Sequence, residues 1–169
     1  MAQTLVEVPA DARAGVRRVA AAAMVLGGAA VVLGTLMPWA KVNLPLLGTQ
    51  TTTGLGSGGD AVFCIVVGAG ACLVGLRTLF SGGPTAQAAT ERAAVALVGV
   101  LGIVAVIFAG FAAKHVDDRL SSLFGHLPDF AKTFVSGEIG TGIWIVGAGA
   151  VVVTLASLAQ VVASAPQRG

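Results

Sequence analysis

The sequence predicts an all-α membrane protein with four transmembrane helices in an up-down-up-down bundle and a small helical cap on the outer side. The 169 residues are 56% hydrophobic and 11% charged, with a mean hydropathy of +0.90, whereas charged residues make up about a quarter of a typical soluble domain. Four apolar stretches have the roughly 20-residue length needed to cross a bilayer. One short inner turn joins the second span to the third, so a simple antiparallel bundle is the expected arrangement.

The first element is a polar N-terminal tail, residues 1–18, followed by an apolar span at residues 19–39. This span is too long for the apolar region of a signal peptide and is followed by no small-residue cleavage site, so we expect it to remain as an anchor. Gly27 and Gly34 fall on a stripe of small residues at helical spacing. Such a stripe allows another helix to approach closely.

An outer loop, residues 40–60, holds β-branched residues between turn formers, which favours a short hairpin. The second span, residues 61–80, follows Asp60, whose carboxylate suits a helix N-cap. Gly68 and Gly75 give this helix a second small-residue face. We therefore predict that it packs closely against a neighbouring span.

The third element is one long helix, Thr85–Phe124, whose centre at residues 93–113 crosses the membrane. Its polar flanks contain no Gly or Pro, so nothing forces the helix to stop at the bilayer surface. At ~1.5 Å per residue, 40 residues reach about 60 Å, twice the hydrocarbon thickness. Gly99 and Gly102 are its predicted packing positions.

The second outer loop, residues 114–142, should hold the end of this helix and a second short amphipathic helix at residues 128–135. Together they would form the outer cap. The last span is predicted at residues 143–162, with Gly147 as a packing position, and residues 164–169 form a C-terminal tail. The four-helix membrane domain then covers residues 19–163. The apolar residues of the cap, which could contact a partner, are Leu120, Leu123, Phe124, Phe130 and Phe134.

The distribution of Lys and Arg predicts a multi-pass protein of the cell membrane with both termini in the cytoplasm. Six such residues lie on the side of the termini and four on the other side, and the side with more faces the cytoplasm. The six are Arg13, Arg17, Arg18, Arg77, Arg92 and Arg168; the four are Lys41, Lys114, Arg119 and Lys132. Trp39 and Trp144 fall at the outer interface and are predicted to anchor it.

No Asp, Glu, Lys, Arg or His lies in the middle of any span. Proton and ion pathways usually need such residues, so a proton-coupled transporter is disfavoured. Cys64 and Cys72 lie within an apolar run and are interpreted as packing residues. We expect no enzymatic activity, no cofactor and no metal. The formal charge of +2 gives no indication of nucleic-acid binding.

A set of polar residues gathers on the outer side, and its role stays open between three interpretations. A solvated helical extension is favoured, a Zn²⁺ or Mn²⁺ site is an alternative because imidazole and carboxylate suit these ions, and a pH-responsive or partner-binding surface is the third. The spacing matches no known metal signature. The residues are His115, Asp117, Asp118, His126, Asp129 and Glu138.

Three segments at the membrane boundaries carry a resemblance to a known class. They are Leu36–Trp39, the Gly-rich Gly54–Asp60 before the second span, and Gly140–Trp144 at the start of the fourth. Their layout resembles that of small four-span integral membrane proteins of actinobacteria. That resemblance implies an accessory place in the cell envelope.

Our functional hypothesis is a non-enzymatic accessory or scaffold subunit of a membrane or cell-envelope complex. Its partners would be the lipid bilayer and other membrane protein subunits or further copies of itself, since its small-residue faces exceed what one bundle uses. The alternative is a homo-oligomeric pore or passive transport component. A pore needs a polar stripe, and the spans offer only Thr35, Thr154, Ser157 and Gln160.

Overall fold

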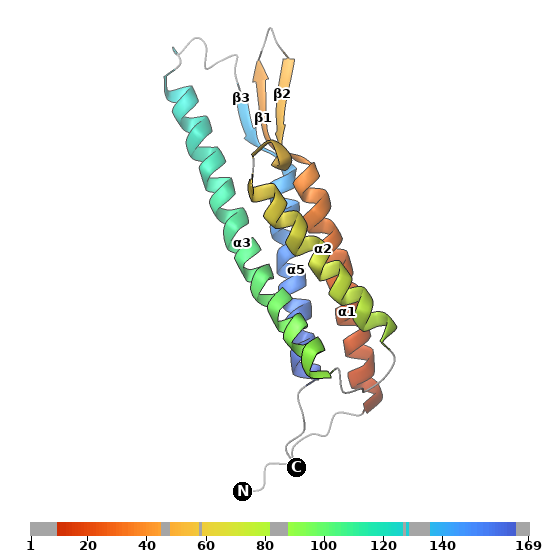
Figure 1. Cartoon of the computed structure of the whole chain (residues 1–169). Helices are drawn as coiled ribbons and strands as arrows, with labels where there is room; N and C mark the ends of the chain where they lie inside the picture. The colour runs from red at the N-terminus through yellow and green to blue at the C-terminus, as the bar shows by residue number, and fades with distance from the viewer. Residues whose placement is uncertain are drawn as a thin grey trace, which may run out of the picture.

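The computed structural model describes residues 10–44, 48–57, 59–81, 88–126, 128 and 136–164. These residues form four long helices and a small antiparallel sheet (Figure 1). The helices are α1 (Ala10–Leu36), α2 (Gly59–Phe80), α3 (Ala88–Gly125) and α5 (Thr141–Ala163), and the strands are β1 (Pro38–Leu44), β2 (Gly48–Thr53) and β3 (Ser136–Ile139). A short 3₁₀ turn, η1 (Gly54–Ser57), joins β2 to α2.

Each of the four helices is long and apolar enough to cross a membrane, as expected for a multi-pass membrane protein. The spans are Asp11–Leu36, Ala61–Phe80, Thr90–Ser122 and Thr141–Ala163. Helix α1 begins nine residues before the span start predicted at residue 19. Its first turns are polar, and part of the predicted N-terminal tail is therefore helical. It ends at Leu36, before the predicted end at residue 39. Met37 precedes Pro38, and a residue before proline avoids the helical conformation.

Helix α3 is continuous over 38 residues, or about 57 Å at ~1.5 Å per residue. A hydrocarbon core is ~30 Å thick, so this helix continues well beyond the membrane. The continuous helix was expected from the absence of Gly and Pro in its flanks. Its predicted first residues, 85–87, lie outside the described part of the chain.

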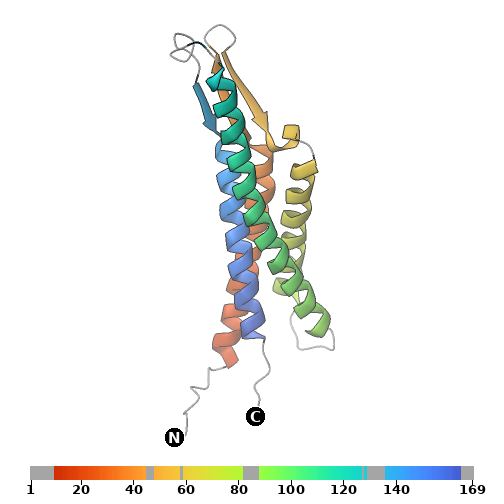
Figure 2. The same ribbon diagram turned by 90° about the vertical axis from the view of Figure 1, so that its left-hand side faces the viewer.

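The helices form a bundle in the spatial order α2, α1, α5, α3. Helix α1 makes its most extensive contacts with α5 and then α2, and α3 packs mainly on α5. Figure 2 shows α1 and α5 side by side along most of their length. The contact between α2 and α3, which follow each other in sequence, is much smaller. The start of α1 and the end of α5 lie at the same end of the bundle (Figure 1).

Small side chains fill the interior of the bundle and large apolar side chains point outward. The buried residues include Ala21, Ala71, Ala105 and Ala150, together with Val31 and Val146. The outward-facing residues include Leu26, Leu73, Leu97, Phe111 and Leu155, each more than half exposed. A soluble protein would bury such large residues. Their outward position is what a bilayer requires, because lipid solvates apolar side chains and leaves close packing to small residues.

The structure differs from the predicted helical cap, because the end of the bundle where α1 stops contains a three-stranded sheet of order β2-β1-β3. The hairpin of β1 and β2 was expected. Strand β3 was not, and it pairs with β1 so that Lys41 lies opposite Glu138. The predicted second cap helix, residues 128–135, lies outside the described residues apart from residue 128. The described part of the cap is therefore a sheet beside the outer end of α3 (Figure 1).

Candidate functional site

Trp39 is the second residue of β1, shortly after the end of α1, and its side chain is only 4% exposed. Its indole Nε1 donates a hydrogen bond to the carbonyl oxygen of Gly34, 3.0 Å away. A Cβ on Gly54 would lie 2.6 Å from the indole, and one on Gly142 would lie 2.7 Å from it. The ring fits because neither position carries a side chain, and its polar group is satisfied inside the protein.

The three segments that carry the resemblance meet around this tryptophan. Trp39 comes from the first, Gly54 from the second, and Gly140 and Gly142 from the third. The backbone N–H of Gly140 donates to the carbonyl oxygen of Trp39 at 2.7 Å, and a Cβ on Gly140 would overlap the Pro38 carbonyl. The glycines at these boundaries thus allow close packing at the end of the bundle that carries the sheet.

Trp144, the second predicted anchor, has a different environment. Its side chain is 64% exposed in the first turn of α5. An exposed indole at the end of a span can reach both the apolar and the polar part of the interface. The two tryptophans therefore do not form one belt, since Trp39 is enclosed by the protein.

One face of the sheet carries a polar network that crosses all three strands. The Asn43 side-chain amide donates to the hydroxyl of Ser136 on β3 at 3.1 Å, and the Thr49 hydroxyl on β2 donates to Asn43 Oδ1 at 2.6 Å. All three residues are exposed. The network holds the strands in register at the end farthest from the membrane.

The other face of the sheet lies against α3. A Cβ on Gly137 of β3 would lie 2.9 Å from Leu120 and 2.7 Å from Phe124, so these two side chains contact the bare backbone of the strand. They belong to the predicted partner surface, and the structure places them against the protein's own sheet. Phe130, Phe134 and the Leu123 side chain lie outside the described residues.

The contact between α1 and α5 is built on two glycine pairs. A Cβ on Gly27 would lie 2.9 Å from the carbonyl oxygen of Gly149, and one on Gly34 would lie 2.9 Å from that of Gly142. Gly27 and Gly34 were predicted packing positions, but Gly149 was missed. The available signal was the seven-residue separation of Gly142 and Gly149, which matches that of Gly27 and Gly34 on the facing helix.

Helix α2 approaches α1 through glycine in the same way. A Cβ on Gly68 would lie 2.7 Å from the carbonyl oxygen of Gly28, and one on Gly75 would lie 2.9 Å from that of Ala21. The Cys72 thiol, between these positions, donates to the carbonyl oxygen of Val25 at 3.3 Å. Both predicted glycines of α2 therefore face α1.

The third helix contact, between α3 and α5, pairs glycines with hydroxyls. A Cβ on Gly99 would lie 2.5 Å from Ser157 Oγ, and one on Gly102 would lie 2.6 Å from Thr154 Oγ1. The Ser157 hydroxyl donates to the carbonyl oxygen of Val95 at 2.5 Å and so ties the two helices together. Gly147 has a looser environment, with its nearest neighbour, the Ala109 methyl group, 3.7 Å from a built Cβ.

The polar residues of the spans are directed into the protomer. Thr35, Ser157 and Gln160 are exposed by 0%, 2% and 3%. The Thr35 hydroxyl donates to the carbonyl oxygen of Val31 at 2.8 Å. Gln160 is different, because its Nε2 has no hydrogen-bond partner within the described part of the chain.

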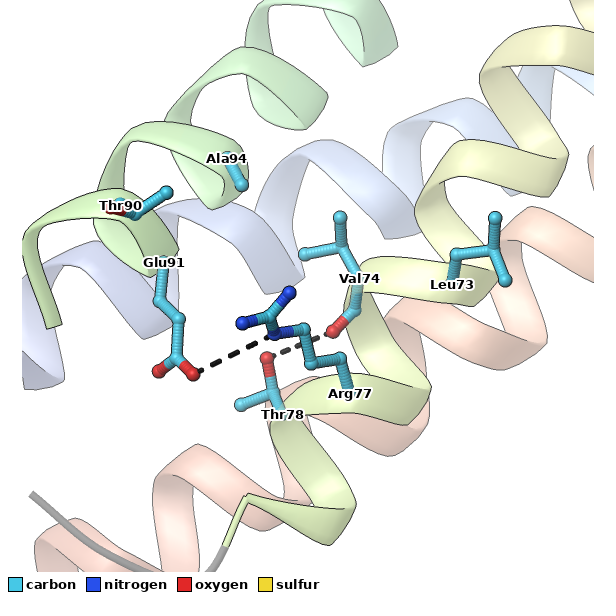
Figure 3. A pocket seen from close by; sticks show the side chains of 7 residues that line it. All are labelled: Leu73, Val74, Arg77, Thr78, Thr90, Glu91 and Ala94. Carbon is cyan, nitrogen blue, oxygen red and sulfur yellow. Dashed lines mark hydrogen bonds and ion pairs between the residues drawn. The ribbon is translucent and has the colours of Figure 1, made fainter. Parts of the chain in front are cut away.

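At the end of the bundle where α1 begins and α5 ends, α2 and α3 border an open cavity of about 210 Å³. It is lined by Leu73, Val74, Arg77, Thr78, Thr90, Glu91 and Ala94 (Figure 3). Arg77 Nε lies 3.9 Å from Glu91 Oε1. The Thr78 hydroxyl is engaged with the carbonyl oxygen of Val74 at 2.9 Å. This cavity combines apolar walls with one cation and one anion.

The described members of the predicted polar set show no arrangement suited to a metal. Among the described residues, no three His, Cys, Asp or Glu side chains lie close enough together to hold an ion. His126 Nδ1 lies 2.7 Å from the carbonyl oxygen of Ser122, in the last turn of α3. Such a contact satisfies one of the carbonyls that a helix end leaves unpaired. Asp129 lies outside the described residues.

Comparison with known proteins adds no relative. No protein-family model, curated protein or solved structure matches the chain. The molecule is therefore described by its own architecture: a membrane protein of four long apolar helices packed in a bundle, with a three-stranded antiparallel sheet at the end where α1 stops and α5 starts.

Proposed function

We propose that the chain is a non-enzymatic accessory or scaffold subunit of a membrane or cell-envelope complex, and that a partner protein adds an extended segment to the free edge of β2. The observation that carries this proposal is the strand order β2-β1-β3. Within the described residues, β1 pairs with one edge of β2 and no strand pairs with the other edge.

The free edge lacks the usual features that prevent strand addition. Soluble and membrane-exposed edges are commonly protected by Lys, Pro or a bulge. Strand β2 has the sequence Gly-Thr-Gln-Thr-Thr-Thr, without charge or proline. In the described pairing of β1 with β2, the register shifts only at the base, between Pro38 and Ala40. Residues 48–52 are exposed. An extended peptide can pair with such an edge through main-chain hydrogen bonds.

The sheet has rigid support for this role. Trp39 joins the base of β1 to the helices, and Leu120 and Phe124 of α3 brace β3 from one face. A docking edge held by a packed base loses little conformational entropy when a partner binds. The two edge strands of the sheet also differ in position: β3 lies on the side of α3, whereas β2 lies on the side away from it (Figure 1).

A second copy of the chain is a poor occupant of this edge. Figure 1 shows the strands running roughly along the helices. Two copies in one membrane are related by an axis along the membrane normal, and such an axis leaves their β2 strands parallel. Antiparallel edge-to-edge pairing would require one copy to be inverted in the bilayer. A different protein, free to approach in the antiparallel direction, fits the edge better.

The polar residues of the spans give little support to the pore alternative. Thr35, Ser157 and Gln160 are buried inside one protomer, so they do not offer a polar lining between protomers. Large apolar side chains occupy the outward faces instead. Contact with lipid or with an apolar partner suits those faces better than contact with a water-filled or ion-conducting path.

The test is affinity purification of the tagged chain in a gentle detergent, with mass spectrometry and a native-mass measurement. We expect a different membrane or envelope protein in stoichiometric amount. The double variant Gln50→Lys, Thr52→Lys places charge on the edge at two exposed positions and should lose that protein. The matched variant Ser121→Lys, Ser122→Lys, on exposed positions of α3, should retain it. Recovery of this chain alone as a homo-oligomer would refute the proposal and favour the pore.

A further inference from the structure

The cavity between α2 and α3 has a gradient of polarity along the bundle axis. Arg77 is in the last turn of α2, and Thr90 and Glu91 are in the first turn of α3, so the charged groups lie at the bundle end. Leu73, Val74 and Ala94 lie about one turn deeper in the span. A phospholipid has the same order, with charged groups at the surface and hydrocarbon beneath them.

The two charged groups are only loosely engaged with each other. The 3.9 Å between Arg77 Nε and Glu91 Oε1 exceeds hydrogen-bond length. The Arg77 side chain is 61% exposed, and Figure 3 shows its terminal nitrogens directed into the space between the two helices. A guanidinium has five N–H donors and matches a phosphate in a two-point geometry. Its remaining donors are therefore suited to a phosphate oxygen.

The carboxylate decides which headgroup the cavity fits. The Glu91 side chain is 20% exposed and lines the same cavity as Arg77, so the lining carries one positive and one negative charge. A purely anionic headgroup would satisfy Arg77 but repel Glu91. A headgroup with a phosphate and a primary ammonium complements both, because the ammonium can donate hydrogen bonds to the carboxylate.

We propose that this cavity binds phosphatidylethanolamine, with its phosphate on Arg77, its ammonium on Glu91 and the start of an acyl chain against Leu73, Val74 and Ala94. The small contact area between α2 and α3 leaves room for the lipid to complete the packing there. This inference is independent of the outer docking edge. The bound lipid would act as a wedge that fixes the angle between the two helices.

The test is native mass spectrometry of the full chain titrated with phosphatidylethanolamine, phosphatidylcholine and phosphatidylglycerol of identical acyl chains. We expect phosphatidylethanolamine to bind about tenfold more tightly than phosphatidylcholine, whose methylated nitrogen has no N–H for Glu91. Equal binding of all three lipids would overturn the proposal. A preference for phosphatidylglycerol would also overturn it, because Glu91 would then take no part in recognition.

Variants of Arg77 and Glu91 test the proposed phosphate contact and the proposed ammonium contact separately. Arg77→Gln should weaken phosphatidylethanolamine binding about tenfold, and Arg92→Gln, an exposed neighbour that does not line the cavity, should leave it unchanged. Glu91→Gln should abolish the preference over phosphatidylcholine and raise phosphatidylglycerol binding. Glu91→Gln also provides the test if Arg77→Gln fails to fold. Unchanged binding in Glu91→Gln would refute the assignment of the ammonium.

A competition experiment distinguishes a lipid from its soluble headgroup. Free glycerophosphoethanolamine carries the same phosphodiester and ammonium but lacks the chains that contact Leu73, Val74 and Ala94. We expect it not to displace phosphatidylethanolamine at equal concentration. Displacement would show that the cavity is a site for the soluble headgroup and would overturn the lipid assignment.

Discussion

At the scale of single residues, two tryptophans that look alike in the sequence have different roles. Both stand at the outer end of a span, which is the usual position of an interfacial anchor. Trp39 is 4% exposed with its N–H bonded to Gly34, whereas Trp144 is 64% exposed. Burial of the first depends on glycines at positions 54 and 142, which are distant in sequence, so inspection of the flanking residues could not reveal it.

This difference predicts how the two residues respond to a quencher in the lipid. In bilayers containing lipids brominated near the headgroup, the fluorescence of Trp144 should be strongly quenched in Trp39→Phe. The fluorescence of Trp39 should be only weakly quenched in Trp144→Phe, because protein surrounds the ring. The measurement is steady-state emission with and without brominated lipid. Equal quenching of the two variants would contradict the buried position of Trp39.

The environment of Gln160 leads to a prediction about the stability of the bundle. Its side chain is 3% exposed and its Nε2 has no partner among the described residues. Replacing a buried donor that lacks a partner by an apolar group of similar size relieves a desolvation cost of about 1 kcal/mol or more. Gln160→Leu should therefore raise the thermal stability measured in detergent. Ser157→Ala, which removes the hydrogen bond to Val95, should lower it.

At the scale of elements, the helices meet through backbone rather than through large side chains. Carbonyl oxygens of Gly28, Gly142 and Gly149 lie where a Cβ on the facing helix would be less than 3 Å away. Glycine permits this approach, which strengthens dispersion contacts between spans. Helices α2 and α5 both approach α1 closely through glycine, so α1 is the central helix of the packing.

The close approach predicts which glycines tolerate a methyl group. A Cβ on Gly149 would lie 2.7 Å from the carbonyl oxygen of Gly27, whereas one on Gly110, also within a span, has no neighbour within 4 Å. Gly149→Ala should destabilise the bundle by about 1–3 kcal/mol through overpacking. Gly110→Ala should be neutral. The free energy of unfolding in detergent micelles checks this, and similar values for both variants would refute the helix contact.

The elements also show what could and could not be predicted from the sequence. The length of α3 was predictable because no Gly or Pro interrupts the polar flanks of its apolar centre before Gly125. The β1–β2 hairpin was predictable because turn formers flank β-branched residues. Strand β3 was not predictable. It has four residues, Ser-Gly-Glu-Ile, without a strand signature, and it forms only by pairing with β1, where Asn43 and Ser136 are 93 residues apart.

At the scale of the whole molecule, the candidate surfaces lie at opposite ends of one bundle. The start of α1, the end of α5 and the cavity of Arg77 lie at one end, and the sheet lies at the other. The Lys and Arg distribution predicts that the end with the termini is cytoplasmic. If that prediction holds, the sheet faces the outside of the cell and the lipid site lies in the inner leaflet.

Cysteine labelling in intact cells tests the orientation. In a background with Cys64 and Cys72 replaced by alanine, Ser122→Cys should react with a membrane-impermeant maleimide, because residue 122 is exposed on the outer part of α3. Ser81→Cys, just after α2 at the other end, should react only after the cells are permeabilised. The reverse pattern would place the sheet in the cytoplasm.

The measurement that tests the central claim most directly is photocross-linking in living cells from a photoreactive amino acid placed at Thr51 on β2. We predict one discrete adduct with a different protein, and no such adduct from the same probe at Leu97, an outward-facing position of α3 that is 60% exposed. An adduct of twice the chain's own mass, or no adduct from Thr51 under conditions that label Leu97 with lipid, would contradict a partner strand at this edge.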